Sequence, residues 1–112
     1  MTVVQVQFTI DDREKGDAIA TELLQQRLVA CAQTIGPITS RYWWQGSIAR
    51  SEEWLFLCKT TPDRVDAVIE RIRAAHPYDV PEIVACDITA GFEPYIDWIA
   101  RETHLPPDTA RS

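Results

Sequence analysis

The sequence predicts an α+β sandwich, in which a four-stranded antiparallel sheet carries two helices on one face. Four separate stretches have the composition of strands, the first with alternating apolar and polar residues and the last two apolar on both faces, and two stretches with the apolar spacing of a helix lie between them. The order is therefore strand, helix, strand, strand, helix, strand, followed by a short terminal helix. This order folds most simply as a ferredoxin-like sandwich.

The first strand and helix are expected within the first 28 residues. Alternation from residue 4 to residue 10 is typical of a strand with one buried face. Asp11 and Glu14 have the spacing of a capping box, so a helix should begin at about residue 12. Its apolar positions recur at helical spacing and end at about residue 28.

A long hairpin should follow this helix. Residues 30–44 are too rich in β-branched and aromatic side chains for a loop, and their apolar phase shifts by one residue at Gly36-Pro37. Such a shift indicates a β-bulge. Gln45-Gly46-Ser47 has the composition of a turn, and the chain then returns through Glu53 to Thr60 as the third strand.

The second half of the chain should contribute two helices and one strand. Thr61-Pro62-Asp63 is a helix start signal, with threonine as N-cap and proline at the first helical position. The helix should end before His76-Pro77, because the residue ahead of a proline is driven out of the helical region. A fourth strand is expected over residues 83–89, and a short helix should follow Gly91 and Pro94.

Length and charge restrict the function. With 112 residues the chain has room for one domain, which we assign to residues 1–102, and we expect residues 103–112 to form a flexible tail. The 17 acidic side chains exceed the 11 basic ones, and a net charge of −6 argues against nucleic acid as a partner. Because we find neither a membrane-spanning apolar run nor a secretion signal, we expect a cytoplasmic protein with no membrane partner.

The predicted sandwich leaves one face of the sheet uncovered. Apolar residues of the third and fourth strands lie on that face, and the second strand, with Tyr42, Trp43 and Trp44, extends past the sheet. Uncovered apolar surface of this extent marks an interface, so we expect these aromatic residues to lie between subunits of a homo-oligomer. A stacking platform for a ligand ring is the alternative interpretation.

One loop combines several candidate metal ligands. The segment from His76 to Glu82 holds an imidazole, the phenol of Tyr78 and two carboxylates. Imidazole and carboxylate suit zinc or copper, and the thiol of Cys31 would make such a site softer and favour copper. In the structural alternative, His76 only meets the end of the second helix, where an imidazolium is favourable, and Glu82 is solvated.

The three cysteines form no C-x-x-C pair, which excludes a zinc ribbon and a disulfide-rich scaffold. An odd number of cysteines without a secretion signal favours reduced thiols in the cytosol. We expect Cys58 and Cys86 to be small buried apolar residues. Cys31 stands where a helix passes into a strand, a place where strand ends often line clefts.

Three charged residues of the third strand carry separate expectations. Lys59 lies among apolar neighbours and should need a partner, either in a salt bridge or in an anion site. Glu52 and Glu53 follow the hairpin turn and should form a solvated edge.

Five stretches of the sequence resemble the CutA divalent-cation tolerance proteins. In chain order they are Arg27-Leu28-Val29-Ala30-Cys31, Tyr42-Trp43-Trp44-Gln45-Gly46, Lys59-Thr60-Thr61, His76-Pro77-Tyr78-Asp79-Val80-Pro81-Glu82-Ile83 and Tyr95-Ile96-Asp97-Trp98-Ile99. The chain departs from the family pattern at Gln45, where Glu is usual, at Gly36-Pro37, where the order is reversed, and at Arg41, where an aliphatic residue is common.

The resemblance implies a tight trimer assembled through long strands, similar to the trimers of PII signalling proteins. It also implies a role in tolerance of divalent metals, with copper as the metal most often bound. Carried over residue by residue, the ligand cleft contains Cys31, His76 and Glu82 as metal ligands, with Lys59 and Tyr78 nearby.

Three functions follow as hypotheses. The leading one is a non-enzymatic homotrimer that binds a divalent cation, first of all Cu²⁺, and contributes to metal homeostasis. The alternative is a PII-like signalling or scaffold trimer that binds a small metabolite or a protein. The third is an enzyme with Cys31 as a nucleophile activated by His76, for which we see no oxyanion-hole motif.

Overall fold

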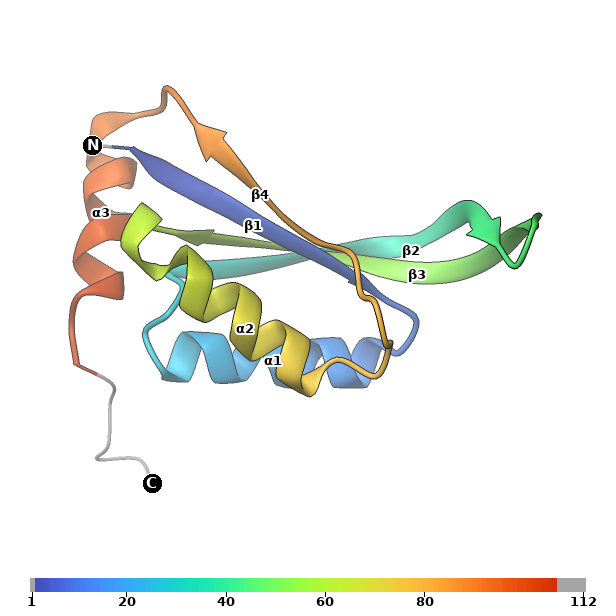
Figure 1. Ribbon diagram of the computed structural model, residues 1–112. Helices are drawn as coiled ribbons and strands as arrows, with labels where there is room; N and C mark the ends of the chain where they lie inside the picture. The colour runs from blue at the N-terminus through green and yellow to red at the C-terminus, as the bar shows by residue number, and fades with distance from the viewer. Residues whose placement is uncertain (1, 107–112) are drawn as a thin grey trace.

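The computed structural model describes residues 2–106 and contains one four-stranded antiparallel sheet (Figure 1). The elements are β1 (Val3–Ile10), α1 (Arg13–Gln25), β2 (Cys31–Trp44), β3 (Ser47–Thr60), the 3-10 turn η1 (Pro62–Arg64), α2 (Val65–Ala75), β4 (Ile83–Ile88) and α3 (Glu93–Thr103). The strand order is β2-β3-β1-β4, which confirms the predicted fold class.

The core lies between one face of the sheet and the helices α1 and α2 (Figure 1). The even-numbered residues of β1 point into this core and are buried, as their alternation predicted. Phe8 stacks on Phe56 of β3 with ring centroids 4.9 Å apart. Helix α1 lies close against this pair, because a Cβ atom added to Gly16 would be only 2.6 Å from Cζ of Phe56.

Both predicted boundaries of the first helix are corrected. Asp12, not Asp11, is the N-cap of α1, and its Oδ1 accepts the N–H of Lys15 at 3.1 Å. The helix ends at Gln25 rather than at about residue 28, because Arg27 adopts a positive φ of 60°. At the other end of the chain, Thr103 is buried in α3, so it does not belong to a tail; residues 107–112 of the predicted tail lie outside the described residues.

The hairpin of β2 and β3 is longer than the rest of the sheet. Their register shifts between Ile35 and Ile38, which confirms the predicted bulge. Strand β3 pairs with β1 only from Thr60 to Trp54, so residues 38–53 continue as a two-stranded ribbon that projects from the body (Figure 1). We call this ribbon the arm. Gln45 and Gly46 both have positive φ, which fits a two-residue type I′ turn at its tip.

Among the described residues, helix α3 covers one end of the second face of the sheet, and the rest of that face has no covering helix. Helix α3 packs there, with Ile96 and Ile99 against Val3. The rest, which we call the open face, presents residues that alternate with the core positions, including Gln5, Gln7, Cys31, Gln33, Ile35, Leu55, Leu57, Lys59, Val84 and Cys86. Within the described residues, no helix is long and apolar enough to cross a membrane.

Candidate functional site

Cys31 begins β2 at the end of the open face that α3 borders. Its side chain is half-buried, and its Sγ lies 3.3 Å from Oη of Tyr95. The hydrogen bond to Cys31 and burial raise the pKa of Tyr95 to about 12, so the phenol keeps its proton at neutral pH. The register places Lys59 directly opposite Cys31. A thiol, a phenol and an ammonium group therefore meet at this end of the sheet.

Lys59 has a neutral partner. Its Nζ donates to Oε1 of Gln33 at 3.0 Å, and no ion pair joins it to a carboxylate among residues 2–106. Lys59 thus has the partner that it was expected to need, but this partner is an amide on the neighbouring strand and not the carboxylate of a salt bridge; the alternative of an anion site stays a prediction.

The other two cysteines differ from each other. Cys58 is fully buried in the core, as expected, and burial raises the pKa of its thiol to about 12, which keeps it protonated and unreactive. Cys86 is exposed, so the prediction that it is buried is wrong for the single chain. The reason is topological: β4 is an edge strand, and Cys86 points to the open face beside Gln5.

His76 follows α2 directly and is buried against the end of β1. Its Nε2 lies 2.7 Å from the carbonyl oxygen of Thr9, and its Nδ1 accepts the N–H of Tyr78 at 3.1 Å. Because a carbonyl can only accept, Nε2 carries the proton. Both ring nitrogens are thus occupied, and a metal would have to replace one of these two hydrogen bonds. Within one chain His76 fastens the loop to the sheet.

Tyr78 and Glu53 form a contact that sequence reasoning missed. The Tyr78 ring packs edge-on against His76, and its hydroxyl donates to Oε2 of Glu53 at 2.8 Å. Glu53 is only 7% exposed, so the prediction of a solvated edge is wrong at this residue. The arm leaves the sheet at Glu53, and the loop after α2 folds over that point. Burial, the hydrogen bond to Glu53 and the charge of Asp11 raise the pKa of Tyr78 above its ordinary value.

Removing this hydroxyl tests the contact. Tyr78→Phe leaves a buried carboxylate without its donor and should lower the free energy of unfolding by about 1–3 kcal/mol. Urea denaturation at one fixed protein concentration measures the difference. Arg73→Met, which removes the donor of the exposed carboxylate Glu70 on α2, is the matched control and should stay within about 0.5 kcal/mol of wild type. Equal stability of Tyr78→Phe and the control would show that Glu53 needs no donor.

The predicted ligands do not meet within one chain. Cys31 aligns with Gln5 of β1 through Lys59, whereas His76 binds Thr9 of the same strand. These points are four residues apart, or about 13 Å along a strand. Exposed Glu82 directly precedes β4, at the His76 end of the sheet. Across residues 2–106, no three His, Cys, Asp or Glu residues are grouped so that they could hold a metal ion.

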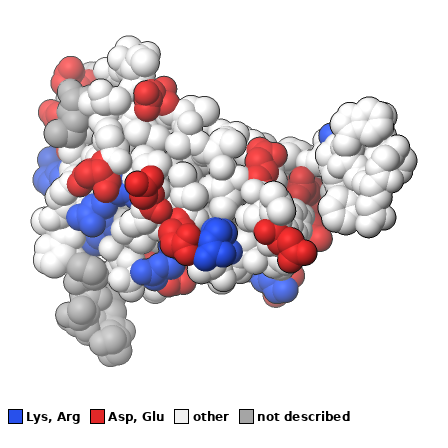
Figure 2. Space-filling model, in the orientation of Figure 1, with Lys and Arg blue, Asp and Glu red and all other residues white. Residues whose placement is uncertain are grey.

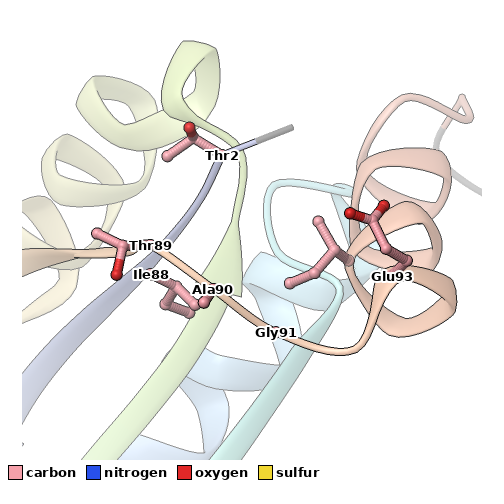
Figure 3. Close-up of a pocket in the computed structure, with 7 residues that line it drawn as sticks. Thr2, Ile88, Thr89, Ala90, Gly91 and Glu93 are labelled. Atoms are coloured by element: carbon pink, nitrogen blue, oxygen red, sulfur yellow. The ribbon is translucent and has the colours of Figure 1, made fainter.

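A shallow pocket lies apart from these residues (Figure 3). It has a volume of about 370 Å³ and lies between the end of β4 and the start of α3. Its lining consists of Thr2, Ile88, Thr89, Ala90, Gly91, Glu93 and Ile96. Glu93 is its one charged residue, and none of the predicted site residues lines it.

The aromatic residues of the second strand occupy the end of the arm. Trp43 is 74% exposed and Trp44 is 61% exposed, and Ile48, directly opposite Trp43, is 66% exposed. In the single chain these three large apolar side chains are therefore grouped together and exposed at the end of the arm. Their position beyond the sheet agrees with the sequence prediction.

Comparison with known proteins gives one consistent result. The profile of the family described as "CutA1 divalent ion tolerance protein" matches residues 4–102. The "Divalent-cation tolerance protein CutA" of Thermus thermophilus is 41% identical over 98 residues, which cover 88% of this chain and 95% of that protein. "Protein CutA 1, chloroplastic" of Oryza sativa is 34% identical over 100 residues, 89% of this chain and 56% of that longer protein.

Solved structures show the same likeness. The crystal structure of the divalent ion tolerance protein CutA1 from Ehrlichia chaffeensis has a TM-score of 0.87 at 34% identity. The match covers 92% of this chain and 96% of that one. The likeness therefore includes the helices, the sheet and the arm.

Proposed function

Because the chain belongs to the CutA1 divalent ion tolerance protein family, we propose that it is a non-enzymatic homotrimer that binds a divalent cation between its subunits. Copper is the cation that its thiol favours. The protein contributes in this way to tolerance of divalent metal ions. The observation that carries the proposal is that the candidate ligands lie at opposite ends of one sheet within a single chain, so that a site containing all of them takes residues from two subunits.

The surface supports assembly. Leu55, Leu57 and Val84 lie on the open face without a covering layer. The arm is a two-stranded ribbon, and such a ribbon is at best marginally stable without further packing. Other copies of the chain that pack on the open face and on the arm tip bury this apolar surface and stabilise the ribbon. The resemblance to the CutA family implies such a trimer, similar to those of PII proteins.

The chemistry of the candidate ligands supports a soft cation. In a cleft between two chains, the Cys31 end of one subunit supplies a thiolate, and the loop with Glu82 of the next supplies a carboxylate. His76 joins as a third ligand only by giving up its hydrogen bond to Thr9 or the one from Tyr78. A thiolate combined with imidazole favours copper or zinc over calcium or magnesium.

Two features support a non-enzymatic protein that resides in a reducing compartment. The Cys31 thiol is hydrogen-bonded to the phenol of Tyr95, and His76 lies at the other end of β1, so His76 is not positioned to activate Cys31 as a nucleophile. All three cysteines are free, as expected of a cytoplasmic protein.

Metal titration tests the site. Calorimetry with Cu²⁺ and with redox-inactive Zn²⁺ should show saturable binding to wild type. Cys31→Ser should weaken it by about tenfold or more, since even the loss of an outer-shell contact costs 10–100-fold. Cys86→Ser, the other strand cysteine of the open face, is the matched control and should bind as wild type does.

Equal affinity in wild type and Cys31→Ser would refute the proposed site. Absence of metal binding in wild type, together with a rise in thermal stability on adding a small metabolite, would instead favour the PII-like alternative.

A further inference from the structure

Two arginines face each other on the arm. Arg41 of β2 pairs directly with Arg50 of β3, and both are exposed. Neither forms an ion pair with a carboxylate within residues 2–106. Like charges directly opposite each other in a sheet repel, so this pair destabilises an isolated arm. Alternation along the strands puts Trp43 and Ile48 on the same face of the ribbon.

The charge of the arm tip is opposite to that of the body. Residues 40–51 contain these two arginines and no acidic residue, which gives a charge of +2. The rest of the chain holds nine basic and 17 acidic side chains, a net charge of −8. Figure 2 shows acidic side chains distributed over the body and the base of the arm, with none at its tip. The tip of the projecting arm therefore presents positive charge to a neighbouring molecule.

One segment of the chain carries charge opposite to that of the arm tip. Residues 74–100 contain five acidic residues and no lysine or arginine. All five are exposed and form no ion pair among the described residues: Asp79, Glu82, Asp87, Glu93 and Asp97. The segment includes β4, an edge strand whose outer side pairs with no other strand among residues 2–106. Such an edge is a natural place for another copy to add.

We propose that Arg41 and Arg50 form a clamp that receives carboxylates from the β4 segment of a neighbouring copy. This inference rests on the proposed homotrimer and assigns the electrostatic part of its contact. Trp43 and Ile48 on the same face provide the apolar part. A carboxylate between the two guanidinium groups turns their repulsion into two charge-assisted contacts. Complementary charge of this kind sets the direction of docking and its salt dependence.

Charge reversal tests the clamp. Sedimentation of R41E/R50E should show a dissociation constant about tenfold or more above that of wild type. D79K/D87K, which reverses charge on the acceptor, should assemble equally poorly. Combining both reversals in one chain, R41E/R50E/D79K/D87K, places opposite charges at every contact of a trimer and should restore assembly; circular dichroism checks that each variant folds. R13E/R101E, with the same change in charge at exposed arginines of α1 and α3, is the control and should assemble as wild type does.

Salt gives an independent readout. Subunit exchange of wild type should accelerate as ionic strength rises, and R41L/R50L should assemble with little salt dependence. Assembly of R41E/R50E equal to that of the R13E/R101E control would overturn the clamp while leaving the trimer intact. Failure of R41E/R50E/D79K/D87K to assemble, while folded, would overturn the β4 acceptor. A monomeric wild type would overturn the proposed function itself.

Discussion

Replacing Trp43, Trp44 and Ile48 with serine should convert the oligomer into folded monomers. These side chains are 61–74% exposed in the single chain and lie at the tip of the arm, away from both core clusters. Full burial of one large apolar side chain contributes about 1.5–3 kcal/mol. Each subunit contributes such an arm, so the triple substitution removes several times this energy from assembly while leaving the core of the subunit unchanged.

Analytical ultracentrifugation measures the change in mass, and circular dichroism checks that the monomer keeps its helices and sheet. Leu24→Ser is the matched control, because Leu24 is an exposed apolar residue on α1, on the side of the molecule that the helices cover. The control should assemble as wild type does. A triple variant that still sediments as the wild-type oligomer would show that the arm tip is not part of the interface.

Phe56→Ala should lower the free energy of unfolding by about 3–5 kcal/mol. Phe56 is 1% exposed and stacks on Phe8 at the centre of the sheet. Helix α1 packs against the ring at Gly16, which has no side chain to fill the space left by its removal. A change of this size exceeds half the stability of a marginally stable domain.

Phe92→Ala is the control for this prediction, because Phe92 has the same side chain but is 75% exposed before α3. It should change stability by no more than about 0.5 kcal/mol. Urea denaturation of both variants at the same protein concentration provides the comparison, since assembly makes stability depend on concentration. Similar losses in the two variants would contradict the position of the core described here.

The features that could be predicted from the sequence are those that neighbouring residues determine. Alternation in β1 fixed its buried face, and the change of phase at Gly36-Pro37 located the bulge, because both depend only on the pleat of a single strand. The helix end before His76-Pro77 was also predictable, since a proline restricts the residue ahead of it.

The features that were missed depend on contacts between distant segments. Glu53 is buried because Tyr78, 25 residues later, folds over the point where the arm leaves the sheet. Cys86 is exposed because β4 is an edge strand, which follows from strand order and not from the alternation of its residues. The ring nitrogens of His76 are occupied by Thr9 and by the loop backbone, so a residue typical of metal sites has a structural role in the subunit.

A metal site that forms between subunits should be lost when the subunits separate. The same Cu²⁺ titration is carried out on wild type and on the folded monomer with serine at positions 43, 44 and 48, which retains Cys31, His76 and Glu82. We expect saturable Cu²⁺ binding to the oligomer and binding weaker by about tenfold or more to the monomer. Equal affinity in the two proteins would place the metal site within a single chain and contradict the account.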